Sequence, residues 1–249
     1  MPFKSLFPVI LVLFSFSAFS QTIKYDAVTG QIANLAQAQH REIISEVRFD
    51  GVDGTSGRIP YDKVKGSPFW REEFIPAKLY TKTGQIYSAT IRLNLATNEI
   101  HFLKNGEEMV LVGLDVSRIM FTDKDSVIFL GNIPHLFIQN KKVDDYMQVL
   151  SAGEYQLLKH KKRKVGSADS LFRTQKRYFF TDEIYYFLHF NDRVERIKKL
   201  NKDAILEYLP LASSFAAFIE QNKIDFKKEA DVIRFLNYYN ANRKALQKQ

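Results

Sequence analysis

The clearest pattern along the chain is an alternation of apolar and polar residues between Phe74 and Val112. Apolar side chains occupy every second position from Tyr87 to Leu93, which gives a strand one buried and one solvated face. A turn precedes a second strand at Glu99–Lys104, and Asn105-Gly106 then favours a type I′ hairpin turn because both residues tolerate positive φ. Glu108–Val112 is the return strand. The pattern therefore predicts an antiparallel meander.

Further short runs of β-forming residues follow at a spacing of roughly 8–12 residues, which is typical of a barrel-like or sandwich-like antiparallel sheet. They are Arg118–Phe121, Val127–Leu130, Leu136–Ile138, Tyr146–Leu150, Tyr155–Leu158, Arg177–Phe180, Ile184–Phe190 and Val194–Lys198. Ile184–Phe190 is apolar or aromatic on both faces, so we expect a strand that is covered on both sides. A platform for stacking a ligand is the sharper alternative for the same run.

After Leu200 the apolar period changes from that of strands to that of helices. Asn201 is the expected N-cap of a short helix that runs through Leu209 and is ended by Pro210, and Leu211–Gln221 follows as a second helix. Asp225 is the expected cap of a last helix, whose apolar stripe consists of Val232, Ile233, Phe235, Leu236 and Tyr239.

The segment from Gln21 to about Asp62 has a weaker pattern. Ile43, Ile44 and Val47 fit a strand, and Asp50–Gly57 is dense in turn formers and is expected to be a loop. This loop lacks the alternating ligands and the terminal Glu of a calcium hand, so a calcium site is disfavoured.

The first 20 residues have the three parts of an export signal. Lys4 supplies positive charge, Leu6–Phe19 is an uncharged apolar run, and Ala18 and Ser20 place small residues at positions −3 and −1 of a cleavage site. The run of about 14 residues is shorter than the ~20 that a membrane-spanning helix needs. We expect cleavage after Ser20 and no transmembrane segment in the mature chain, which is then periplasmic, outer-membrane-associated or secreted.

These patterns predict a mainly β fold, with an antiparallel meander in a barrel-like or sandwich-like sheet and a helical C-terminal cap, α+β overall. The expected organisation is a signal peptide over residues 1–20, a β-rich domain over 21–200, and a helical cap over 201–249 that packs on the same domain. The 249-residue chain contains no cysteine. Disulfides, a catalytic thiol, thiolate zinc sites and cysteine-ligated iron–sulfur clusters are therefore excluded.

The positive charge is concentrated in one segment. The whole chain carries a net +8, and residues 155–200 contain 12 Lys and Arg against 5 Asp and Glu. The centre of this segment is the possible polyanion contact Lys159, Lys161, Lys162, Arg163 and Lys164, followed by a loop by composition over 165–170. The export signal argues against nucleic acid as the partner, so lipid A phosphates, acidic polysaccharides and membrane surfaces are the anionic candidates. The alternative is a solvated hairpin tip whose lysines protect an edge strand from pairing.

The sequence offers no catalytic motif. None of His40, His101, His135, His160 and His189 stands in a close metal-ligand pair, and no nucleophile elbow or phosphate-binding loop is present. Neighbouring carboxylates point to opposite faces of a strand, so three adjacent pairs do not form acid/base dyads: Glu72-Glu73, Glu107-Glu108 and Asp144-Asp145. His189 and Trp70 are more simply explained as packed side chains than as a ligand and a sugar platform. We therefore predict no catalytic residue, no cofactor and no metal.

Four segments of the chain are similar to a group of uncharacterised exported proteins from Gram-negative bacteria. They are Gly66-Ser67-Pro68-Phe69, the strand Arg92-Leu93-Asn94 with its continuation Asn98-Glu99-Ile100, Gly153–Lys159, and the helix Asp231–Tyr239 followed by Asn240. The resemblance implies a location in the cell envelope and carries over no functional residues.

Three functions remain open from the sequence. The first is a non-enzymatic protein that binds an envelope protein or an anionic surface polymer. The second is a hydrolase on a β scaffold that uses dispersed Asp and Glu residues, which requires a concave pocket with two carboxylates. The third is a structural subunit whose helical cap docks onto a larger assembly, and whose β fold survives when the chain stops near Leu200.

Overall fold

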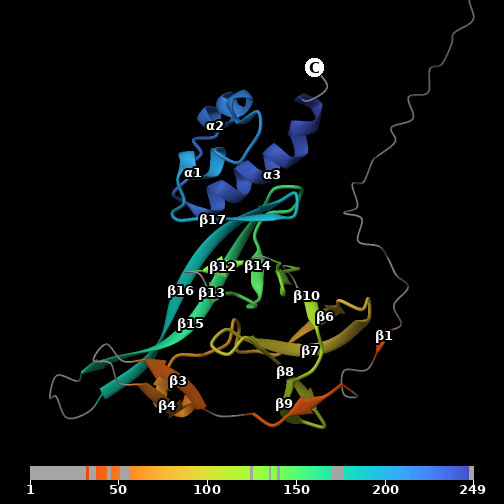
Figure 1. The fold of residues 1–249 in the computed structure, drawn as a ribbon, viewed down its shortest axis with the longest axis vertical. Helices are drawn as coiled ribbons and strands as arrows, with labels where there is room; N and C mark the ends of the chain where they lie inside the picture. Colours follow the sequence, from red (N-terminus) through yellow and green to blue (C-terminus); the bar gives the residue numbers. More distant parts are fainter. Residues whose placement is uncertain are drawn as a thin grey trace, which may run out of the picture.

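The computed structural model describes residues 32–33, 38–43, 46–50, 56–123, 126–134, 136–138, 141–169 and 176–246. Over these residues the molecule is elongated, with its helices at one end and a β-meander toward the other (Figure 1). One large, mostly antiparallel sheet contains most of the strands, which confirms the predicted mainly β fold with a helical C-terminal cap. No helix in the described part is both long and apolar enough to cross a membrane.

The predicted meander is present. Its four strands are β6 (Ile75–Thr81), β7 (Ile86–Asn94), β8 (Glu99–Lys104) and β9 (Glu107–Leu111). Asn105 and Gly106 join the last two strands with φ of 54° and 85°, as a type I′ turn requires. Leu79, Ile91 and Leu93 on the apolar face are completely buried, so the alternation correctly identified the core face.

The meander continues through three short strands into a long hairpin and a final edge strand. These are β10 (Val116–Phe121), β11 (Ile128–Leu130), β14 (Met147–Val149), β15 (Gln156–Asp169), β16 (Lys176–Phe190) and β17 (Arg193–Ile197). A separate small hairpin consists of β12 (Phe137–Ile138) and β13 (Lys141–Lys142). The path of paired strands ends at β17 and, beyond β9, at β2 (His40–Arg41), which do not pair with each other. The sheet is therefore open and is not a closed barrel.

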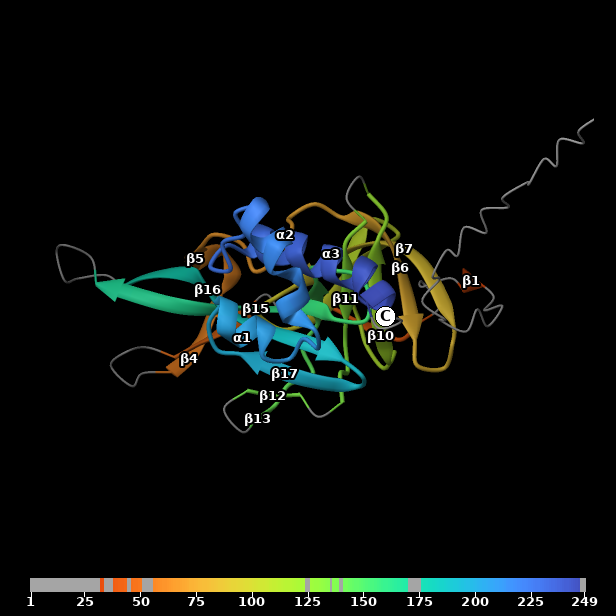
Figure 2. The ribbon, with the colours of Figure 1, turned by 90° about the horizontal axis from the view of Figure 1, so that it is seen from above.

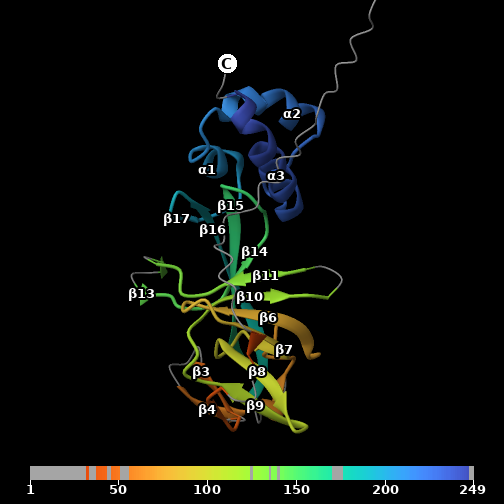
Figure 3. The ribbon, with the colours of Figure 1, turned by 90° about the vertical axis from the view of Figure 1, so that its right-hand side faces the viewer.

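The hairpin of β15 and β16 forms the long axis of the molecule and connects its two ends (Figures 1 and 3). The two strands pair without interruption from Gln156↔His189 to Asp169↔Lys176. Arg177–Phe180 and Ile184–Phe190, predicted as two strands, are thus parts of one strand. The polar residues between them are accommodated because Thr181 and Asp182 are exposed at a level of the hairpin that no helix covers.

The N-terminal part adds short strands around this frame. β3 (Glu46–Asp50) and β4 (Ser56–Pro60) form an antiparallel hairpin, and β5 (Val64–Lys65) follows a single 3₁₀ turn over Tyr61–Lys63. β1 (Ile32–Ala33) pairs with β7. The predicted loop Asp50–Gly57 is wrong at both ends, which are paired strand residues. Ile44 and residues 51–55 lie outside the described residues.

The helical cap matches the apolar period of the sequence. It consists of α1 (Lys202–Leu206), a 3₁₀ turn (Ala212–Phe215), α2 (Ala216–Gln221) and α3 (Glu229–Leu246). Asn201 caps α1 as predicted, because its Oδ1 accepts from the N–H of Ala204 at 2.8 Å. Asp225 does not cap α3, since the helix begins only at Glu229 and the Asp225 carboxylate accepts from the N–H of Lys227 instead.

The cap and the upper end of the hairpin share one core. Val232, Phe235, Leu236 and Tyr239, all from the predicted stripe of α3, are fully buried. They pack in the same cluster as the strand residues Leu157, Leu188 and Ile197 and as Tyr155, which precedes β15. The helical cap therefore covers one face of the aromatic strand, as predicted. On its other face Phe187 packs with Ile133, Leu136 and Ile138 from the segment around β12 (Figure 2).

Candidate functional site

The basic run predicted as a polyanion contact lies in the middle of β15, away from the hairpin tip. Lys159–Lys164 is paired residue by residue with Thr181–Tyr186 of β16. The predicted loop over 165–170 is wrong up to Asp169, because β15 continues through these residues. Val165 is buried, and a Cβ at Gly166 would come within 3.3 Å of the Phe179 ring, so this glycine provides close packing in a strand.

Each cation of the predicted contact already has a carboxylate partner. The pairs are Lys159–Glu229 (2.7 Å), Lys161–Asp182 (2.7 Å), Lys162–Asp145 (2.9 Å), Arg163–Asp182 (3.2 Å) and Lys164–Glu183 (2.7 Å). Burial tends to raise the pKa of Asp182, but hydrogen bonds from Lys161 and Arg163 outweigh it and lower this pKa. The carboxylates thus stay charged and compete with any external anion for these cations.

Two of the histidines are buried against carboxylates. His160 Nε2 lies 2.9 Å from Asp145 Oδ2, and His101 Nδ1 lies 2.8 Å from Glu108 Oε1. The second nitrogen of each ring has no hydrogen-bond partner, and both side chains are almost completely buried, with only 2% (His101) and 3% (His160) of their surface exposed. Neither lines one of the three hollows described below, so we assign both pairs to the packing of the sheet.

The remaining candidates behave as packed or separated side chains. His189 Nδ1 lies 3.1 Å from Gln156 Oε1, and burial lowers the pKa of its ring. Trp70 packs against Phe121 and Phe129 in the core of the meander. His40 is half-buried with its Nδ1 2.9 Å from the carbonyl of Ala38, and His135 lies outside the described residues.

Asp144 and Asp145 point in different directions, although they lie between β13 and β14 and not in a strand as predicted. Asp145 faces the interior with His160, whereas its neighbour Asp144 pairs at the surface with Lys142 at 2.9 Å. Among the residues that the structure describes, no group of three His, Asp or Glu side chains could hold a metal ion.

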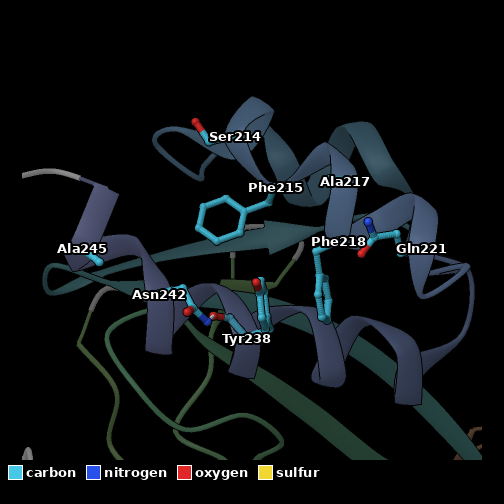
Figure 4. A pocket seen from close by; sticks show the side chains of 8 residues that line it. All are labelled: Ser214, Phe215, Ala217, Phe218, Gln221, Tyr238, Asn242 and Ala245. Atoms are coloured by element: carbon cyan, nitrogen blue, oxygen red, sulfur yellow. Dashed lines mark hydrogen bonds between the residues drawn. The ribbon is translucent and has the colours of Figure 1, made fainter. Parts of the chain in front are cut away.

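Among the described residues, three surface hollows are considered as possible binding sites. The first, of about 290 Å³, lies between α2 and α3 and contains the parallel rings of Phe218 and Tyr238, 3.6 Å apart, with no charged lining residue (Figure 4). The second, of about 690 Å³, lies beside β5 near the far end of the hairpin, where Lys63 pairs with Asp62 at 3.8 Å. The third, of about 310 Å³, lies where β17 ends against β16.

The third hollow is the strongest candidate because three exposed lysines and no carboxylate line it, whereas Asp62 lines the second hollow. We call it the lysine groove; its lining residues are Ile184, Tyr185, Tyr186, Ile197, Lys198, Lys199, Leu200 and Lys227. Lys198, Lys199 and Lys227 are exposed, and none of them has a carboxylate oxygen within 4 Å in the part of the chain that the structure describes. The groove is thus a small hollow with tyrosine and isoleucine walls and three free ammonium groups.

Packing of the cap brings these three lysines together. Lys198 and Lys199 follow the last residue of β17, and Lys227 precedes α3. Their buried neighbours Ile197, Leu200 and Phe226 belong to the one core that the cap shares with the hairpin. The sequence analysis missed this site because its members are far apart in the chain; the only signal was the Lys198-Lys199 pair at the end of a predicted strand.

The floor of the groove is electrically neutral. The O–H of Tyr186 donates to Glu229 Oε2 at 2.6 Å, and Lys159 neutralises the same carboxylate. Burial and this hydrogen bond raise the pKa of Tyr186, so the ring remains a neutral phenol at physiological pH. The arrangement is suited to an anionic group whose neighbouring atoms contact aromatic and aliphatic surface.

Comparisons with family models, with curated proteins and with solved structures found no match. The function is therefore inferred from the geometry of the chain itself.

Proposed function

We propose that this chain is an exported cell-envelope protein that acts by binding, and that it holds an anionic group of its partner in the lysine groove. Residues 1–20 direct export and are removed after Ser20. The mature chain then acts in the periplasm, at the outer membrane or outside the cell. The long hairpin separates the helical cap from the meander and exposes the groove on the side of the molecule.

The observation that carries this proposal is the difference between two sets of lysines. The cations of the run Lys159–Lys164 are compensated by Asp145, Asp182, Glu183 and Glu229. The three lysines of the groove have no such partners. An incoming anion gains attraction at the groove without displacing an existing ion pair, which makes the groove the better site.

No feature of the described hollows favours the hydrolase alternative. A hydrolase of this kind requires two carboxylates in one pocket. The three hollows contain one carboxylate between them, Asp62, and this side chain is paired with Lys63.

The proposal is tested with sulfated dextran as an anionic probe of the purified mature chain. We expect the triple variant K198S/K199S/K227S to bind the probe about tenfold more weakly or worse, since three charge contacts of a few tenths of a kcal/mol or more each are lost. The matched control is K161S/K162S/K164S, which removes the same charge from the compensated run. We expect this control to bind like the native chain.

Raising the salt concentration provides an internal check. Exposed charge contacts are screened over about 8 Å at physiological ionic strength, so binding should weaken steadily as salt is added. Equal binding by the native chain and the groove variant would overturn the assignment of the groove. Loss of binding only in the control would show that the run Lys159–Lys164 on β15 is the binding site instead.

A further inference from the structure

One edge of β16 has a gap in its strand pairing. Along this edge, opposite β15, β5 pairs with Tyr178 and Phe179, and β17 pairs with Tyr186–Phe190. Between them, Phe180–Tyr185 pairs with no strand in the described part of the chain. We call these six residues the edge gap. In Figure 1 this edge faces outward below β17, on the left of the molecule.

The register shows which backbone groups point into the gap. The N–H of Arg163 donates to the carbonyl of Leu95 at 3.1 Å, so the backbone groups of Arg163 point away from β16. Asp182 is the partner of Arg163 in the antiparallel ladder, and its N–H and C=O therefore point away from β15 and into the gap. Because this direction alternates along a strand, Phe180 and Ile184 share it.

The two-residue turn at the end of β16 gives the same result independently. Asn191 and Asp192 have φ of 46° and 59°, the values of a type I′ turn, and Phe190↔Arg193 closes it. Phe190 therefore points its backbone groups toward β17, as do other even-numbered residues of β16. In the parallel ladder with β5, the N–H of Phe180 donates to the carbonyl of Lys65. The backbone N–H groups of Asp182 and Ile184 have no backbone acceptor among the described residues.

An open edge of this kind can accept another strand. Its length limits what can enter, because six residues span only about 20 Å. A second copy pairing through its own β16 does not fit. That strand has 15 residues and would run into β17 at one end of the gap and β5 at the other. The occupant is therefore a short extended segment.

The charges beside the gap determine the composition of that segment. Within the gap, Asp182 is matched by Lys161 and Arg163, and Glu183 is matched by Lys164. The lysine groove forms the end of the gap next to β17, because Ile184 and Tyr185 line it. The uncompensated charge met by an incoming strand is thus positive. Ile184 is 42% exposed and offers apolar contact within the gap.

We propose that the edge gap binds an extended acidic segment of a partner protein, which adds a strand to β16 and places its carboxylates in the lysine groove. This inference rests on the proposed function and names the class of partner. The strand's backbone bonds to Asp182 and Ile184, and its acidic end neutralises Lys198, Lys199 and Lys227. An anionic polysaccharide would use the lysines alone and would leave the edge unpaired.

The test uses a capped ten-residue peptide with alternating Thr and Val in the centre and two Glu at each end. Two further versions are N-methylated at alternate positions, one set at odd and the other at even residues. Only one set removes the donors that face β16, so we expect one version to lose about tenfold or more in affinity and the other to bind nearly normally. Hydrogen exchange at Asp182 and Ile184 should slow when the unmodified peptide binds.

A substitution in the protein provides the matching experiment. Asp182→Pro removes an N–H that points into the gap and is not needed for pairing with β15, so the fold should tolerate it. Asp182 does not line the lysine groove. The control Asp182→Thr loses the same charge and keeps the N–H. We expect Asp182→Pro to lose the peptide and Asp182→Thr to bind it, whereas both variants should bind sulfated dextran equally.

These results distinguish strand addition at the edge gap from anion binding in the lysine groove. If the peptide binds through the lysines but is indifferent to N-methylation and to Asp182→Pro, strand addition is overturned and the anionic groove stands. The same conclusion follows if sulfated dextran binds and the peptide does not. If the groove variant binds both probes like the native chain, the proposed function itself fails.

Discussion

Asn240 in α3 and Tyr155, the residue before β15, are joined by two hydrogen bonds between the asparagine side chain and the tyrosine backbone. The N–H of Tyr155 donates to Asn240 Oδ1 at 3.0 Å, and Asn240 Nδ2 donates to the carbonyl of Tyr155 at 2.8 Å. The same Nδ2 also donates to the carbonyl of Ala152 at 2.9 Å. One side chain thus takes the place of a neighbouring strand and attaches the last helix to the long hairpin.

Replacing this side chain should loosen the cap. We expect Asn240→Ala to lower the free energy of unfolding by about 2 kcal/mol or more, because three hydrogen bonds are lost and partly buried backbone groups are left unsatisfied. The matched control is Asn242→Ala, which loses a single bond to the carbonyl of Tyr238. Urea unfolding of both variants measures the difference. Equal stability of the two would contradict the role of Asn240.

The glycine beside this contact should be even less replaceable. Gly153 has φ of 115°, and a Cβ there would lie 2.6 Å from Asn240 Cγ. Gly153→Ala therefore combines backbone strain with a collision. Gly106→Ala is the control, since Gly106 also has positive φ but has no atom within 4 Å of such a Cβ. We expect a cost of about 1 kcal/mol for the control, and a clearly larger loss at Gly153 in thermal unfolding.

Local patterns predicted those parts of the fold that depend on local chemistry. The turn at Asn105-Gly106 and the cap at Asn201 need only neighbouring residues, and both are present. The long hairpin was underestimated because Thr181 and Asp182 interrupt the apolar pattern. Their place in the strand depends on cross-strand partners such as Arg163, which lies 19 residues from Asp182 in the chain.

The candidate site was less predictable than the fold, for a related reason. Charge density along the chain identified Lys159–Lys164, but it could not show that carboxylates from three separate segments neutralise these residues. The lysine groove depends on the position of Lys227 relative to Lys198 and Lys199, which only the packing of the cap determines. Gly153 and Asn240 are far apart in the chain but adjacent in the structure, and this relationship too is tertiary.

Acid should destabilise the hairpin through Asp145. Burial alone would raise the pKa of this carboxyl, but hydrogen bonds from His160 and Lys162 more than offset it and lower the pKa below 3.8. A carboxyl with a lowered pKa in the folded state stabilises the fold above its unfolded value, and this contribution is lost as the pH falls through the folded value. We expect Asp145→Asn to lessen the decline in stability below about pH 4, measured by urea unfolding from pH 6 to pH 2. The exposed Asp144→Asn is the control, and an unchanged pH profile in Asp145→Asn would refute the prediction.

If the chain is exported, cleavage of its signal peptide gives the mature form a defined N-terminus. The mature chain should begin at Gln21, because Ala18 and Ser20 supply the small side chains that a signal peptidase site requires. Intact-mass measurement of the protein from fractionated cells tests this directly. Ala18→Leu should block processing and leave the precursor attached to the inner membrane, whereas Ala18→Gly should be processed normally. Recovery of an uncleaved chain in the cytoplasm would overturn the assignment to the envelope.

Deleting the helical cap should cost the chain its stable β fold. A chain that stops near Leu200 would uncover Leu157 and Leu188, which are completely buried and pack in one cluster with Phe235 and Tyr239 of α3. Burying a single Leu contributes about 1.5–3 kcal/mol, so exposing several such residues exceeds what a marginally stable domain can lose. We therefore expect residues 21–200 to aggregate or to bind a hydrophobic dye, in contrast to the survival that a merely docked cap implies. Removing only residues 247–249 should leave the unfolding temperature unchanged, and a soluble, cooperatively unfolding 21–200 fragment would show that the cap is an independent unit.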